Sequence, residues 1–221
     1  MSIIEIISTY REGFANGLLT TLKLCLIVWF AGFVVGTLLG ILGSKFKLMI
    51  GVPSKIISFI LSGTPVLVFL FWVHYPLQTM LNIIIDPFYT TAMTISIINI
   101  FAVAEIVRNS IAELPQQYIE AAKVYGISSK KRLVKIELPI IFRFVLPSFL
   151  ILQVNMLHLT LFGSLISVDE IFRTCQRVNA QIYQPIEIYT ALGIFFILVC
   201  LPLNSLAYWL KIKFSRDLSE R

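Results

Sequence analysis

Long apolar runs separated by shorter polar segments form the main pattern of the chain. Five runs provide the roughly 20 apolar residues that a helix needs to cross the hydrocarbon core of a bilayer. They lie at residues 18–42, 56–75, 88–107, 144–166 and 188–210. Apolar residues cover every side of these segments, as is typical of helices embedded in lipid. The pattern predicts an all-α integral membrane protein, a single domain over residues 1–221, with five transmembrane helices.

The composition supports a membrane protein and excludes two other classes. Hydrophobic residues make up 57% of the chain and charged residues 14%, whereas a soluble domain is about 25% charged. So few charges cannot cover a water-exposed surface, and so many apolar residues exclude an intrinsically disordered chain. The net charge of +6 would suggest nucleic acid in a soluble protein. Because no basic face carries stacking aromatic residues, we expect no nucleic-acid partner.

The distribution of basic residues predicts the orientation in the membrane. With the N-terminus outside, 14 of the 18 Lys and Arg residues fall in cytoplasmic segments and 3 fall in outer segments. Cytoplasmic connections are enriched in these residues. The asymmetry therefore predicts an outer N-terminus, a cytoplasmic C-terminus and an odd number of spans.

A stripe of small residues occupies one face of the first span. Gly32, Gly36 and Gly40 recur at every fourth position. This spacing lets two helix backbones approach closely in lipid. We therefore expect a helix–helix contact along the stripe rather than a ligand contact.

The connection between the third and fourth spans, residues 108–143, is too polar for lipid. Pro115 suits the first turn of a helix, and Gly126 suits the left-handed residue that ends one, so a short helix is predicted between them. A second, amphipathic helix is predicted over residues 130–137, and Pro139 either ends it or opens the next span.

Two interpretations of this helix pair remain open. The small side chains of Ala121 and Ala122 would allow the first helix to dock in a groove of another protein. Alternatively, the pair lies on anionic lipid headgroups through the basic residues of the second helix, Lys130, Lys131, Arg132 and Lys135.

Several motifs resemble those of a transporter family. Glu120-Ala121-Ala122, followed by Gly126 and then by Ile136-Glu137-Leu138-Pro139, resembles the EAA loop of ABC importer membrane subunits. Residues 62–68, 104–108 and 160–170 resemble three further stretches of the polar amino acid uptake family of permeases. The resemblance extends over nearly the whole chain.

The resemblance implies a five-span permease subunit of a bacterial inner membrane that pairs with a second permease chain, identical or homologous. It further implies a cytoplasmic ABC ATPase dimer, which would bind ATP and Mg, and an extracytoplasmic binding protein that delivers an amino acid. The residues implied to couple to the ATPase are Glu120, Ala121, Ala122, Gly126, Leu138 and Pro139. His158-Leu159 replaces the Lys-Asp pair of the family, which argues against a cationic substrate held by this chain.

The chain carries no sequence signature of an enzyme. It contains no G-x-x-x-x-G-K-[ST] motif and hence no phosphate-binding loop, so we expect no ATPase site, cofactor or metal in this chain. Energy for active transport would enter through the cytoplasmic loop and drive alternating access. The main alternative is an ATP-independent secondary carrier or channel, which would need internal repeats that the sequence lacks. An intramembrane enzyme using Glu105 or His158 would lack a second catalytic partner.

Polar residues inside the spans are costly and usually face the protein interior. The candidates to line a substrate path are Thr64, Asn155, His158, Thr160 and Ser164. The alternative role is a helix–helix hydrogen bond worth roughly 0.6 kcal/mol, which we favour for Asn99.

Charged residues mark both membrane boundaries. Glu105 and Arg108, three residues apart on the third span, are expected to form either a structural ion pair or an inner gate. The outer loop at residues 167–184 is either a solvated surface or a seat for the binding protein, and its charged residues are Asp169, Glu170, Arg173 and Arg177.

Overall fold

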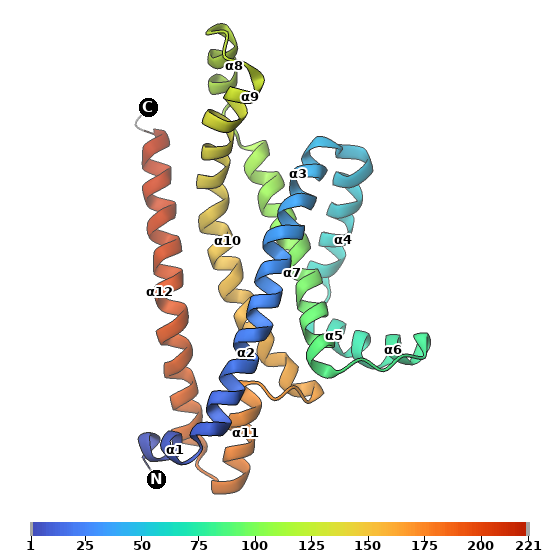
Figure 1. Ribbon diagram of the computed structural model, residues 1–221, viewed down its shortest axis with the longest axis vertical. Helices are drawn as coiled ribbons and strands as arrows, with labels where there is room; N and C mark the ends of the chain where they lie inside the picture. The colour runs from blue at the N-terminus through green and yellow to red at the C-terminus, as the bar shows by residue number, and fades with distance from the viewer. Residues whose placement is uncertain (1, 220–221) are drawn as a thin grey trace.

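The structure, a computed structural model, describes residues 2–219 and contains helices but no strand over that range (Figure 1). Glu220 and Arg221, which belong to the expected cytoplasmic tail, lie outside the described residues. The α-helices are α1 (Ile3–Thr9), α2 (Arg11–Ala31), α3 (Thr37–Lys45), α4 (Val52–Gly63), α5 (Val66–His74), α6 (Pro76–Leu81), α7 (Pro87–Ala112), α8 (Gln116–Val124), α9 (Ser129–Arg132), α10 (Leu138–Thr160), α11 (Ile171–Ile182) and α12 (Pro185–Ser219). Between them lie the π-helical turns η1 (Gly32–Gly36), η2 (Lys47–Gly51) and η3 (Leu133–Glu137) and the 3-10 segment η4 (Leu161–Ile166).

Four continuous helical runs in the described part of the chain are long and apolar enough to cross a membrane. They are Arg11–Lys45, Pro87–Ala112, Ser129–Ile166 and Pro185–Phe214. Each run encloses one of the ranges expected from the sequence and exceeds the roughly 20 residues that a span requires. The protein is therefore a multi-pass membrane protein.

The range expected at residues 56–75 is not one straight helix. It is divided into α4 and α5, and the helical segments on either side of the break meet at 101°. Pro65 disfavours the α-helical conformation of the residue before it, and Thr64 is accordingly extended, with φ −100° and ψ 126°. Because α4 has 12 residues, it rises about 18 Å, less than the hydrocarbon core of about 30 Å. A single crossing of the membrane in this region would therefore need both α4 and α5.

The glycine stripe of the first span packs directly against α7, which confirms the predicted contact. A Cβ atom at Gly40 would lie 2.7 Å from the Val107 Cβ and 2.9 Å from the Ala104 carbonyl oxygen. A Cβ at Gly36 would lie 2.8 Å from the Ile100 carbonyl oxygen. The two helices can approach to this distance only because these positions carry no side chain.

The described bundle is elongated, with α7 packed against α2, α3 and α10 in its middle. Helices α8 and α9 lie at one end, and α1 and α11 lie at the other (Figure 1). The N-terminus is at the α1 end, whereas α12 finishes toward the α8 end.

Candidate functional site

The short helix α8 has sharply defined ends. Pro115 precedes it, and Gly126 follows it in the left-handed conformation, with φ +65°. Beyond its last residue, the Tyr125 N–H donates to the Ala121 carbonyl and the Ile127 N–H donates to the Ala122 carbonyl, both at 3.0 Å. A residue with a Cβ at position 126 would be strained.

One face of α8 is available to a partner. Ala122 is buried, whereas Glu120 and Ala121 are exposed. Val124 and Tyr125 are 86% and 84% exposed, although they lie outside the candidate spans. We call Glu120, Ala121, Val124 and Tyr125 the elbow surface. Large apolar side chains beside a small residue and a carboxylate are suited to insertion into a groove of another protein.

The second short helix expected at residues 130–137 is not a separate element. Helix α9, the turn η3 and helix α10 form one continuous run from Ser129, and Pro139 occupies the first turn of α10, where a proline is tolerated. Arg132 and Glu137 form an ion pair of 2.6 Å across η3. Pro139 therefore opens the next helix and ends none, and its neighbour Leu138 is exposed.

The Glu105–Arg108 pair is part of a contact between α4 and α7. Arg108 is 5% exposed and its Nη1 donates to the Ser54 Oγ at 2.7 Å. Glu105 accepts a hydrogen bond from the Ser58 Oγ at 2.8 Å and lies 3.5 Å from the Arg108 Nη2. The pair thus ties α4 to α7, and these contacts are compatible with both roles expected for it, a structural ion pair and a gate.

The five candidate path residues differ in exposure and in hydrogen-bond partners. The hydroxyl groups of Thr64, Thr160 and Ser164 donate to carbonyls of their own helical segments. Thr160 and Ser164 are also buried. Asn155 and His158, in contrast, are exposed on α10. The His158 Nε2 lies 3.3 Å from the Cys200 Sγ of α12.

A buried amide pair, of which the sequence singled out Asn99 but not Gln153, connects α2, α7 and α10. The Asn99 Nδ2 donates to the Gln153 Oε1 at 3.0 Å and to the Val28 carbonyl at 2.8 Å. The Trp29 Nε1 donates to the Gln153 carbonyl at 3.1 Å. This geometry supports the helix–helix role favoured for Asn99. Gln153 was detectable in the sequence as an amide within an apolar run, but which side of this helix would be buried was not.

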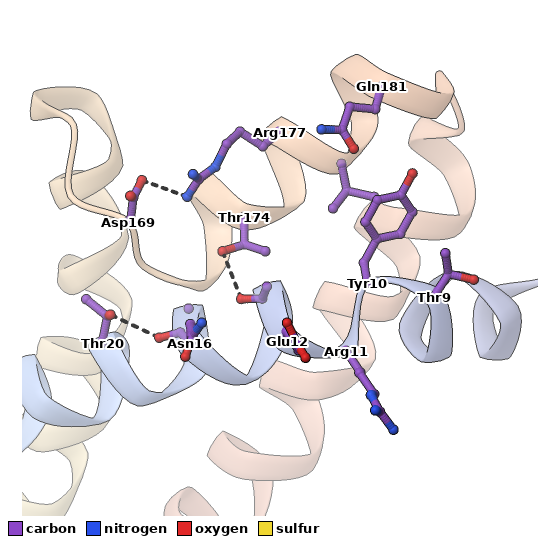
Figure 2. A pocket seen from close by; sticks show the side chains of 13 residues that line it. Thr9, Tyr10, Arg11, Glu12, Asn16, Thr20, Asp169, Thr174, Arg177 and Gln181 are labelled. Atoms are coloured by element: carbon purple, nitrogen blue, oxygen red, sulfur yellow. Dashed lines mark hydrogen bonds and ion pairs between the residues drawn. The ribbon is translucent and has the colours of Figure 1, made fainter.

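A polar cleft of about 570 Å³ opens at the α1 end of the bundle, between α11 and the start of α2. Figure 2 shows the Asp169 and Arg177 side chains pointing toward each other, with 2.7 Å between Oδ1 and Nη2. Gly17 permits the close approach of the helices, because a Cβ there would contact the Thr174 side chain and the Glu170 carbonyl oxygen. The cleft could receive a polar segment or a small polar solute.

Glu170 lies beside this cleft and is fully buried. Its carboxylate accepts hydrogen bonds of 2.8 Å from the N–H groups of Phe172 and Arg173 at the start of α11. Burial nevertheless raises the pKa of Glu170 to about 7, because the charged form loses its solvation. Over the described residues, no three His, Cys, Asp or Glu side chains are grouped closely enough to hold a metal ion.

Comparison with known proteins assigns this architecture to a family. A family model described as the inner membrane component of binding-protein-dependent transport systems matches residues 32–216. The L-cystine transport system permease protein TcyB of Bacillus subtilis is 28% identical over 91% of this chain and 86% of its own length. The glutamine transport system permease protein GlnP of Escherichia coli is 25% identical over 86% of this chain and 87% of its own length.

Solved structures share the fold. An amino acid ABC transporter crystallised with histidines contains a chain that matches with a TM-score of 0.78 at 21% identity, covering 96% of this chain and 99% of that chain. An inward-facing MetNI methionine ABC transporter matches with a TM-score of 0.71 at 15% identity, covering 93% of this chain and 98% of that chain.

Proposed function

This chain belongs to the family of inner membrane components of binding-protein-dependent transport systems, and from that premise we propose that it is the permease subunit of an ATP-driven amino acid importer of a bacterial inner membrane. The observation that carries the proposal is the family match over residues 32–216. Relatives named as permeases for L-cystine and glutamine transport support an amino acid as the cargo. The chain itself is a membrane transport subunit, and the ATP and Mg would bind to a separate ATPase.

The elbow surface is the contact through which the ATPase would act. A helix with fixed ends can move as a rigid lever, since Gly126 and Pro115 stop it from merging with the flanking segments. The exposed Tyr125 and Val124 would enter a groove of the ATPase, and Glu120 would pair with a basic group at its rim. The motion would tip the spans between outward and inward openings, because ATP binds one arrangement better than the other.

The remaining partners follow from the orientation. With the N-terminus outside and the C-terminus in the cytoplasm, α8 faces the ATPase dimer and the cleft at Asp169 and Arg177 faces the binding protein. A second permease chain, which the family resemblance implies, would complete the path.

The test uses two variants. One reverses the charge of Glu120 on the elbow surface, and the other introduces strain at Gly126, directly after α8. We expect Glu120→Lys and Gly126→Val to insert normally but to lose ATP-driven uptake, because the first variant repels the basic group and the second disturbs the end of α8. Uptake of labelled L-cystine and L-glutamine is measured in proteoliposomes containing the chain, its ATPase and its binding protein.

Glu113→Lys is the matched control. Glu113 is exposed at the end of α7, close to α8 but outside the elbow surface, and its charge reversal should leave uptake nearly unchanged. Full uptake by both elbow variants would refute the lever. Gradient-driven flux without ATP would instead identify a secondary carrier or channel.

A further inference from the structure

A second cavity near the α1 end of the bundle differs in character from the polar cleft. It has a volume of about 310 Å³ and is formed by residues of α1, α2, α11 and α12. Apart from Arg11 and the Cys175 thiol, every side chain that lines it is a hydrocarbon. An ordered water needs about two to four polar partners, so water is a poor occupant. We call this site the apolar cavity.

The apolar cavity extends along two helices from the membrane boundary inward. Its lining residues on α2 run from Arg11 to Leu18, and those on α12 run from Ile188 to Phe195. On each helix they follow the three- and four-residue spacing of a single face. Both runs begin close to the start of a candidate span, and seven residues of helix rise about 10 Å. The cavity thus has the depth and direction of a lipid acyl chain.

Arg11 provides the one charged group of the apolar cavity. Its side chain is exposed and has no hydrogen-bond or ion-pair partner among the described residues. Arg11 also borders the polar cleft, but Figure 2 shows its guanidinium pointing away from Asp169 and Arg177. A guanidinium binds phosphate oxygens well. An unpaired guanidinium beside an apolar cavity therefore suits a ligand with an anionic head and a hydrocarbon tail.

Helix α1 places the apolar cavity next to lipid. The helix lies across the end of the bundle (Figure 1) and packs against α2 and α12. It buries Ile6 in this contact, whereas Ile4 and Ile7 are 79% and 45% exposed, and Ile7 also lines the cavity. Apolar side chains exposed on a helix at this level suit the boundary between headgroups and acyl chains.

We propose that the apolar cavity binds an anionic phospholipid of the membrane leaflet at the α1 end. A phosphate oxygen would accept hydrogen bonds from Arg11, and one acyl chain would lie between α2 and α12 against Ile171 and Cys175 of α11. A zwitterionic phospholipid offers the same chain, but its cationic group offsets the attraction to Arg11. The site therefore favours the anionic headgroup. This binding does not depend on the transport function.

The proposal is tested by native mass spectrometry of the purified complex that contains this chain. Phosphatidylglycerol and phosphatidylcholine with identical acyl chains are titrated separately. Arg11→Gln removes the charge, Arg11→Lys retains it, and Ala15→Phe adds bulk at an exposed position that lines the cavity. Lys23→Gln is the matched control, because Lys23 is an exposed cation of α2 that does not line the cavity. Size-exclusion chromatography identifies variants that fail to fold.

We expect Arg11→Gln to weaken phosphatidylglycerol binding about five-fold and phosphatidylcholine binding little. Arg11→Lys should restore most of the difference, Ala15→Phe should weaken both lipids, and Lys23→Gln should bind like the unmodified chain. Unchanged phosphatidylglycerol binding by folded Arg11→Gln, or an equal loss in Lys23→Gln, would overturn the headgroup site.

A photoreactive group in the acyl chain of phosphatidylglycerol tests the position of that chain. After illumination of the complex in membranes, we expect adducts on peptides containing Leu18 or Leu192, both of which line the cavity, and their loss in Ala15→Phe. Adducts confined to other peptides of the chain would refute the acyl-chain site. Neither readout requires ATP-driven uptake, so both results are independent of the proposed importer function.

Discussion

Glu170 combines two opposing influences on a single carboxyl group. Two backbone N–H groups at the start of α11 favour its charged form, whereas burial favours the neutral form and dominates, so the pKa is raised to about 7. The nearby Arg173 guanidinium opposes the rise without cancelling it.

This environment predicts a pH-dependent stability. Because the pKa is raised from 4.5 to about 7, the folded state binds the proton more tightly than the unfolded state. The stabilisation is complete below pH 4.5 and is lost as the pH rises through 7. We expect the Tm of the unmodified chain in detergent to fall between pH 5 and pH 8 by more than that of Glu170→Gln, which stays neutral. Parallel Tm profiles of the two proteins would contradict the prediction.

Asn155 and Gln153 show which properties of a single residue could be predicted from the sequence and which could not. Both are amides in the same apolar run, and the sequence marked Asn155 as a candidate for the path. The structure buries Gln153 against Asn99 and leaves Asn155 exposed. Two residues of separation place the side chains on nearly opposite sides of a helix, and only packing decides which side is buried.

At the scale of elements, replacing a glycine by alanine is expected to lower or raise stability, depending on what surrounds the glycine. Gly40→Ala would force a Cβ against backbone and side-chain atoms of α7 and should cost about 1–3 kcal/mol. A Cβ at Gly193 of α12 meets nothing within 4 Å, so Gly193→Ala should instead gain up to about 1 kcal/mol of helix stability. Thermal unfolding in detergent measures both. A similar Tm change in the two variants would refute the close contact of α3 with α7.

The sequence predicted some helices correctly and missed the break in another. The short helix between Pro115 and Gly126 is present because its signals are local, a proline at the start and a left-handed glycine at the end. The break at Thr64 was not anticipated, although Pro65 was visible, because a proline in a span either kinks a helix or divides it. The outcome depends on which neighbours bind the freed backbone groups.

At the scale of the whole molecule, the two ends of the bundle should lie on opposite sides of the membrane. Glu12 is exposed near the α1 end and Lys130 near the α8 end. We expect Glu12→Cys to react with a membrane-impermeant maleimide in cells whose inner membrane is intact, and Lys130→Cys to react only after permeabilisation. The buried native cysteines provide the blank. The reverse pattern would invert the orientation, and labelling of both residues from outside would refute the span count.

The sequence by itself determined the membrane class, the approximate spans, the expected orientation and the position of α8. These properties depend on hydropathy, charge and turn chemistry over a few consecutive residues. The tertiary structure decided that α4 and α5 meet at an angle, that Asn99 pairs with Gln153, and that Asn155 is exposed while Gln153 is buried. These features depend on the rotation of each helix about its axis, which is set by contacts between residues far apart in the chain.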